Sequence, residues 1–340
     1  MKPALPLSLP GASPRHDRQA SAARGRVAAA VLRALLRYGR AHRGWFFKGT
    51  AAALAVVAGR LSLPLPLKSL TDVWTGAAAP ALLPAALDPA LALGGAFFAL
   101  ILLLGGADHL ERFYFARFTI HTANDLRAAA LAAALARESR PATGDLLARL
   151  LGDTGRVKSG MDGFLVQVAT NGAVFAGMTA VLAVIEPALG LIFVAAGLLI
   201  AAVTAHAAAR VLRIALDHRE REAQFANRVR DALEAEPAAA ADMRRGDPSE
   251  EAQLTHAQGV ATWATHAIFG AAVLAALAAG SNAVAAGRIG VAEMVLFMMY
   301  ALMMRGPLVR LARQGAKSGR ILAAGHRLLQ LIETPAKEPR

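Results

Sequence analysis

The sequence predicts an all-α membrane protein with six transmembrane helices, and three observations support this prediction. Hydrophobic residues make up 56% of the 340-residue chain. They are concentrated in runs of about twenty residues, the length of helix that crosses a hydrocarbon core of ~30 Å. Lysine and arginine gather in alternate connections between these runs, as expected when successive loops lie on opposite sides of a membrane.

The six apolar segments are separated by short polar or helix-breaking sequences. They cover residues 45–67, 89–107, 163–185, 188–207, 262–279 and 291–304. Only Glu186 and Pro187 lie between the third and the fourth. Because proline fits the first turn of a helix but not its interior, this pair predicts a tight hairpin. Pro64 and Pro66 predict a bend in the outer half of the first segment.

The distribution of basic residues predicts the orientation of the chain. Ten lysines and arginines lead into the first segment, and eight follow each of the second, fourth and sixth; the other three connections hold one, none and one. Basic loops remain in the cytoplasm. We therefore expect both termini in the cytoplasm and a multi-pass protein of a bacterial inner (cytoplasmic) membrane. The formal net charge of +13 then reflects topology, and we expect no nucleic-acid partner.

Before the first span, the sequence predicts a tail and an amphipathic helix. Residues 1–26 are rich in proline, serine and arginine, which predicts a disordered basic cytoplasmic tail. Residues 27–43 place apolar side chains on one helical face and arginines on the other. The apolar positions are Val27, Val31, Leu35 and Tyr38. This pattern predicts a helix lying in the membrane interface, with an ordinary cytoplasmic cap helix as the alternative.

The two long cytoplasmic connections have nearly the same length. Residues 108–162 and 208–261 comprise 55 and 54 residues. Each is rich in helix-forming residues, with its breakers clustered near the middle; these are Pro141, Gly144, Pro237, Gly246 and Pro248. We expect the spans to continue as helices to about 38 Å into the cytosol at 1.5 Å per residue. Paired extensions of this length suggest a partner docked at their tips.

Two segments carry a family resemblance. Residues 143–164 resemble the segment that follows the first cytoplasmic loop of ABC exporter transmembrane domains, and residues 287–334 resemble the last span and exit helix of that family. The matching positions are Thr143, Gly144, Asp145, Leu146, Arg149, Leu150, Asp153, Gly306, Pro307, Leu308 and Arg327. The resemblance covers about residues 27–335 and leaves 336–340 as a tail. It implies a type I exporter fold with long cytoplasmic helical extensions.

The resemblance also implies partners. Members pair two six-helix subunits, identical or related, in the lipid bilayer, and ATPase domains drive them. The implied contacts with an ABC ATPase subunit are Arg137, Glu138, Arg140, Pro141, Thr143, Gly144, Ala223, Gln224, Asn227 and Asp231. A phosphate-binding loop needs two glycines before its lysine, and residues 311–318 lack both in register. We therefore expect no enzymatic activity and no cofactor in this chain, with ATP and Mg²⁺ bound by a partner ATPase.

The second cytoplasmic loop departs from the family pattern. Ala235 stands where the family has glycine, and Pro237 follows at once. Two functional hypotheses therefore stay open. The first is the permease subunit of an ATP-driven exporter. The alternative is a degenerate, non-transporting exporter half with a regulatory or structural role in a membrane complex.

Arg60 is the candidate site residue within the spans. A charge inside a span is costly and usually faces a cavity or a partner. Arg60 therefore either lines a substrate cavity, where it meets an anionic or amphipathic molecule, or pairs with a buried group. Asp108 and His109, at the end of the second span, are expected to be solvated. The nine histidines form no metal-ligand motif, so no metal site is expected.

Overall fold

The computed structural model describes residues 29–74, 88–136, 146–234 and 248–333. Backbone alone is described for residues 211–234 and 315–320 and for a few positions within 148–149, 248–257, 323 and 333. The described chain contains six helical segments long and apolar enough to cross a membrane, which confirms the predicted number and the all-α class. They are Ala29–Trp74, Pro89–Leu135, Leu150–Ile185, Pro187–Arg210, Gln258–Ala285 and Val291–Gln314.

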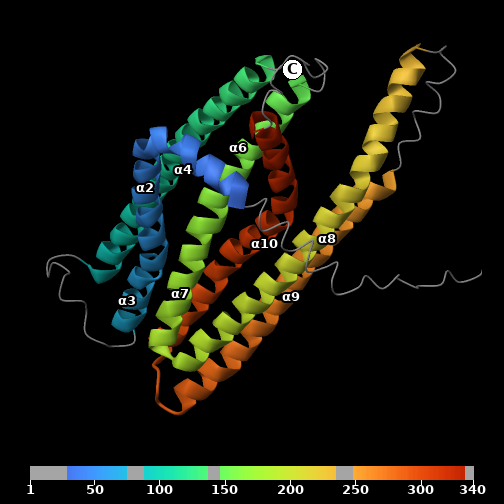
Figure 1. Ribbon diagram of the computed structural model, residues 1–340. Helices are drawn as coiled ribbons and strands as arrows, with labels where there is room; N and C mark the ends of the chain where they lie inside the picture. Colours follow the sequence, from blue (N-terminus) through green and yellow to red (C-terminus); the bar gives the residue numbers. More distant parts are fainter. Residues whose placement is uncertain (1–28, 75–87, 137–145, 235–247, 334–340) are drawn as a thin grey trace, which may run out of the picture.

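The helical elements follow one another with short breaks (Figure 1). A helix over residues 29–39 leads into the 3₁₀ turn η1. The elements η2 and η3 are π-helical and flank α6. The bounds are η1 Arg40–His42, α2 Arg43–Ser62, α3 Leu65–Trp74, α4 Pro89–Leu135, η2 Ala148–Asp153, α6 Thr154–Asp162, η3 Gly163–Thr170, α7 Asn171–Ile185, α8 Pro187–Glu234, α9 Pro248–Ala285 and α10 Val291–Glu333.

Two helices are much longer than a membrane span. The first, α4, has 47 residues and α8 has 48. At 1.5 Å per residue each reaches about 70 Å, more than twice the thickness of the hydrocarbon core. The N-terminus of α4 is capped by Asp88, whose carboxylate accepts hydrogen bonds from the backbone N–H groups of Ala90 and Leu91 at 2.8 and 3.2 Å. The predicted helical extensions are therefore present.

The first span is interrupted near its outer end, as its prolines predict. Helix α2 ends at Ser62 and α3 begins at Leu65. Pro64 lies in the break and has no backbone N–H to donate. The interruption leaves helix carbonyls available, and the hydroxyl of Tyr300 in α10 donates to the Leu61 carbonyl at 2.5 Å. A side chain from the last span thus stabilises the bend in the first.

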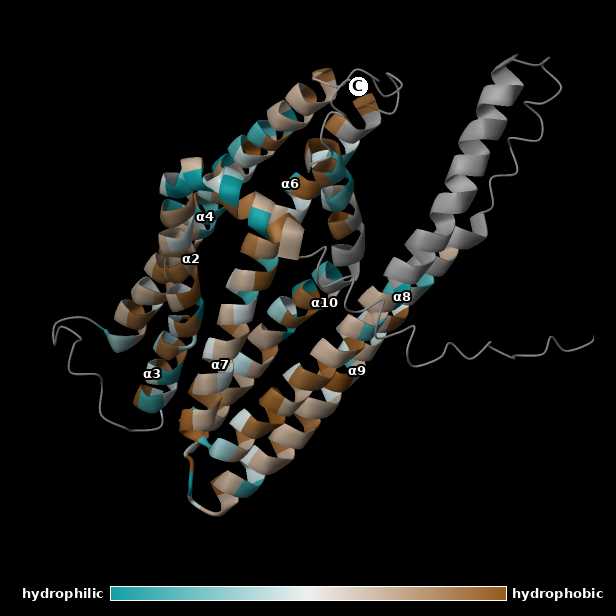
Figure 2. Cartoon of the chain, viewed as in Figure 1, coloured by the Kyte–Doolittle hydropathy of each residue, from teal (hydrophilic) through white to brown (hydrophobic). Residues whose placement is uncertain are grey.

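Helices α8 and α9 form an antiparallel hairpin that packs against α7 and α10, whereas α2 packs against α4. Figure 1 shows the far ends of α8 and α9 extending away from the bundle that contains α4, α6 and the C-terminal part of α10. Hydrophobic residues predominate where α7, α8 and α9 lie together (Figure 2). The part of the hairpin beside α7 is thus largely apolar.

Two separate clusters of buried hydrophobic side chains hold the helices together. The membrane core joins α7, α8, α9 and α10 through residues that include Met178, Phe193, Phe269, Phe297 and Tyr300. The proximal core joins α4, η2, α6 and the end of α10 through residues that include Phe118, Leu126, Leu150, Met161 and Leu328. Helix α10 contributes buried side chains to both cores.

The helix over residues 29–39 packs on the proximal core. Val31 is buried, and Leu35 and Tyr38 lie against the cluster. Gly325 of α10 permits the close approach, since a Cβ atom there would lie 2.8 Å from Cγ1 of Val31. Three of the four predicted apolar positions thus face protein, and Val27 lies outside the described residues. The opposite face carries exposed leucines and arginines, which is compatible with the predicted interfacial position.

Candidate functional site

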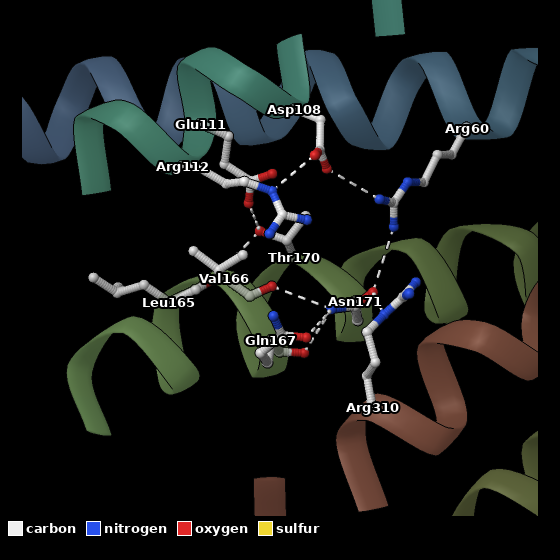
Figure 3. Close-up of polar contacts among 10 residues, drawn as sticks. All are labelled: Arg60, Asp108, Glu111, Arg112, Leu165, Val166, Gln167, Thr170, Asn171 and Arg310. Atoms are coloured by element: carbon white, nitrogen blue, oxygen red, sulfur yellow. Dashed lines mark hydrogen bonds and ion pairs between the residues drawn. The ribbon is translucent and has the colours of Figure 1, made fainter. Parts of the chain in front are cut away.

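Arg60 does not stand alone in the first span. Its guanidinium donates through Nη2 to Oδ1 of Asp108 at 3.3 Å and through Nη1 to Oδ1 of Asn171 at 3.4 Å (Figure 3). These partners come from α4 and α7, and the side chain of Arg60 is 21% exposed. The predicted pairing of Arg60 with other residues is therefore present, and the contacts join three spans.

Asp108 connects two arginines. Besides Arg60, it accepts a hydrogen bond from Nε of Arg112, one turn further along α4, at 2.8 Å. Its side chain is only 30% exposed. Asp108 is half-buried and paired with two arginines, so it is less solvated than expected, whereas His109 beside it is exposed as expected. Helix α4 continues for 27 residues beyond Asp108, so this position lies within a packed helix although the apolar run ends there.

Asn171, the first residue of α7, contacts two arginines, Arg60 and Arg310. Its side-chain oxygen accepts from Arg60 and also from Nε of Arg310 in α10, at 3.0 Å. One amide oxygen thus joins the first and the last span. Figure 3 shows the guanidinium groups of Arg60 and Arg310 converging on this amide from different helices.

The π-helical element η3 sets the position of Asn171. A π-helix leaves carbonyls displaced from the usual i→i−4 register. The amide nitrogen of Asn171 donates to two of them, the carbonyls of Val166 at 3.2 Å and Gln167 at 3.0 Å. Because its nitrogen is bound to the backbone of its own helix, the oxygen of Asn171 points toward the arginines.

A buried acid completes the network. The carboxylate of Glu111 is 1% exposed and accepts a hydrogen bond from the hydroxyl of Thr170, at 2.5 Å. Glu111 precedes Arg112 in α4, and Thr170 precedes Asn171. The pair of Glu111 and Thr170 therefore lies beside the cluster that Asp108 and Asn171 form with the arginines. Each residue of the pair is next in sequence to a member of that cluster (Figure 3).

Charges within this network nearly balance. Three arginines, Arg60, Arg112 and Arg310, lie with two carboxylates, Asp108 and Glu111, so one formal positive charge remains. Ionisable residues at membrane depth are expensive and pair with one another, and they mark substrate or ion pathways in membrane proteins. The surplus positive charge makes this network suitable for contact with an anionic group.

The network lies near one end of the membrane-spanning segments. Asp108 follows Pro89 at the start of α4 by nineteen residues, and Arg310 follows Val291 at the start of α10 by the same number. At 1.5 Å per residue both lie about 28 Å from the helix ends that the short connections join. Asp108 of α4 and Arg310 of α10 thus lie at the same level, close to the far boundary of a ~30 Å hydrocarbon core.

The predicted contacts with an ATPase subunit divide into two groups. Those of the first loop, Arg137, Glu138, Arg140, Pro141, Thr143 and Gly144, lie outside the described residues. Ala223, Gln224, Asn227 and Asp231 lie in the last four turns of α8, where the structure describes the helix and not the side chains. Within the described residues, no group of three or more histidine or acidic side chains could hold a metal ion.

The fold and this network define a class of protein: a polytopic membrane protein with six spans, four of which contribute to a network of paired charges, and with helices that continue beyond the membrane. The family follows from the sequence match. Residues 46–235, more than half of the chain, match the ABC transporter transmembrane region, and the chain belongs to this family. No curated protein matches the sequence.

Proposed function

We propose that this protein is the permease subunit of an ATP-driven exporter. Membership of the ABC transporter transmembrane family carries the proposal. In this proposal two six-helix subunits form the substrate pathway. A separate ATPase chain docks at the tips of the long helices and supplies ATP hydrolysis. Closure of the ATPases then switches the pathway between inward- and outward-facing states.

The shape of the α8–α9 hairpin supports pairing with a second membrane subunit. In the described residues it packs on α7, α10 and itself, and its far end extends away from the other helices. A helix pair of this length gains most of its stability from packing of its apolar face. We propose that the far end packs against the second subunit and carries one of the two ATPase contacts.

The polar network supports a role in the substrate pathway. Paired arginines on the first and last spans meet at Asn171, and one positive charge is left over. We propose that this network lines the pathway and contacts an anionic or amphipathic cargo. Arg60 then has both roles, as a cavity residue and as a paired charge.

The test begins with purification of the full-length tagged chain from its native membrane in mild detergent, followed by mass spectrometry of the proteins that co-purify. We expect an ABC ATPase in stoichiometric amount. Scrambling residues 223–231 should remove it, whereas scrambling residues 211–219 of the same helix, a segment of equal length, should not. Retention of the ATPase by both variants would show that residues 223–231 are not its docking site.

Recovery of a stable complex that contains no ATPase would overturn the exporter proposal itself. The protein would then be assigned to the alternative function, a degenerate exporter half that stabilises or regulates a membrane complex. For a complex with the ATPase, reconstitution in liposomes provides the second readout, since a coupled membrane subunit changes the rate of ATP hydrolysis by its partner.

A further inference from the structure

A cavity separate from the polar network lies between α9 and α10. It has a volume of about 570 Å³, within the range of small-molecule sites, and is lined mainly by side chains of α9. Ala312 and Arg313 contribute from α10. None of the network residues lines it. The cavity is therefore a distinct feature of the fold.

Residues that carry hydrogen-bond donors line this cavity. The Nε2 nitrogen of Gln258 is shielded from solvent and has no hydrogen-bond partner among the described residues. A buried donor without a partner is destabilising, so the side chain of Gln258 gains a hydrogen bond when it turns toward a ligand acceptor. Arg313 likewise has no ion-pair partner among the side chains that the structure describes, and Trp263 contributes an indole N–H. Of the described residues that line the cavity, none is acidic.

The cavity lies at the level of a membrane boundary. Trp263 precedes Ala285, the last residue of α9, by twenty-two residues, and Arg313 follows Val291, the first residue of α10, by twenty-two. Both therefore lie about 33 Å from the connection between these helices, just beyond a ~30 Å hydrocarbon core. Trp263 is 72% exposed. Exposed tryptophan at this level is typical of the belt where aromatic side chains meet lipid headgroups.

We propose that this cavity binds the anionic headgroup of an amphipathic molecule whose acyl chains lie in the adjacent leaflet. Arg313 pairs with the negative charge, and Gln258 and Trp263 donate to its oxygens. The apolar surface of α9 beyond Trp263 contacts the chains, since Leu274, three turns further along the helix on the same face, is 70% exposed. The site depends on the membrane position of α9 and α10, and not on a partner ATPase. It would also suit a cargo that enters from the leaflet.

The test uses the full chain in nanodiscs with Trp45 and Trp74 replaced by phenylalanine, so that Trp263 is the sole fluorophore. Trp263 emission is measured with phosphatidylglycerol or phosphatidylcholine that carries bromine, a contact quencher, in the upper acyl chain. We expect stronger quenching by the anionic lipid. Arg313→Gln should weaken that binding roughly tenfold and Gln258→Leu by a smaller factor, because a charge-assisted hydrogen bond is stronger than a neutral one.

Three control variants keep the result specific. Arg305→Gln removes an exposed arginine from the same helix two turns away and should leave the preference unchanged. A variant that retains only Trp74, at the opposite end of the bundle, should show no lipid preference that depends on Arg313. Arg313→Lys keeps the charge and should retain part of the preference, which separates loss of charge from loss of fold.

Equal quenching by the two lipids, or a preference that survives both Arg313→Gln and Gln258→Leu, would overturn the proposal. Glycerol phosphate provides the remaining comparison. In phosphatidylcholine nanodiscs, glycerol phosphate could change Trp263 emission, and Arg313→Gln could abolish that change. This result would show that the cavity binds a soluble anion, and it would contradict the proposal that a lipid binds there. These readouts require no ATPase, so a negative result leaves the exporter proposal intact, and failure of the exporter proposal leaves this one intact.

Discussion

Arg327 near the end of α10 forms a bidentate ion pair with Asp153, the last residue of η2. Its Nε donates to Oδ2 at 2.6 Å and its Nη2 to Oδ1, across 174 positions of sequence. The carboxylate is 4% exposed. Both residues belong to the segments that carry the family resemblance, and the pair joins those segments in the proximal core.

Loss of Arg327 should destabilise the protein strongly. Among the described side chains, Arg327→Leu leaves the buried carboxylate with the exposed Arg156 as its one ion-pair partner. Removal of one partner of a buried pair costs about 3–5 kcal/mol. The measurement is the unfolding temperature of the detergent-solubilised protein, monitored by size-exclusion chromatography after heating. Arg156→Gln, which removes the exposed partner of the same carboxylate, serves as the control and should cost less than about 1 kcal/mol. Equal effects of the two changes would contradict the buried pair.

Thr170 and Glu111 should behave as a coupled pair. Thr170→Val removes the hydroxyl that donates to the buried Glu111 carboxylate, and an unsatisfied buried acceptor costs about 1–3 kcal/mol. Adding Glu111→Leu removes the acceptor as well, so the double variant should be more stable than Thr170→Val alone. A double variant whose loss equals the sum of the single losses would show that the two side chains do not interact.

Arg60 and Asp108 should likewise be coupled. Arg60→Gln and Asp108→Asn each leave charges of the network without an opposite charge, whereas the double variant removes one charge of each sign. In a thermal-stability cycle we expect a coupling energy of about 0.5–3 kcal/mol. The same cycle with Arg305, an exposed arginine of α10, in place of Arg60 should give a value near zero.

Gly190 should not accept a side chain. A Cβ atom at this position of α8 would lie 2.7 Å from Cα of Ala183 in α7, and backbone cannot move aside as the tip of a side chain can. Gly190→Ala should therefore destabilise the α7–α8 hairpin by about 1–3 kcal/mol. Gly270→Ala is the matched control, because a Cβ atom on that residue of α9 has nothing within 4 Å. It should be neutral or slightly stabilising.

Much of the fold could be predicted from the sequence because membrane helices have a strong local signal. Apolar runs of sufficient length predict the spans, and stretches without proline or glycine predict their extensions. The break after Ser62 follows from Pro64, which cannot donate a hydrogen bond. The chain passes through Pro307 as one helix, however, although the apolar run ends at Met304. The family match, over residues 46–235, covers the first four of the six spans.

The polar network was predicted only in part, because it depends on distances between helices. Arg60 stands out as a charge within an apolar run. Asn171 and Arg310 do not, since an amide and one of many basic residues near a span end give no local signal. They are 111 and 139 positions away from the residues they bind. The π-helical geometry of η3, which turns the Asn171 oxygen toward the arginines, has no pattern in the sequence that we identified.

Helix α10 is the one described element whose buried side chains belong to both hydrophobic cores, through Met304 and Leu308 in the membrane core and Leu328 in the proximal core. Within the membrane core, between Met304 and Leu308, its Pro307 lacks the N–H that would close the preceding turn. Close-packed cores shift between discrete arrangements and do not deform continuously. Rotation at the C-terminal end of α10 must therefore either repack the membrane core or bend the helix at Pro307. We therefore expect a displacement of the proximal core to reach the membrane core through this one continuous helix.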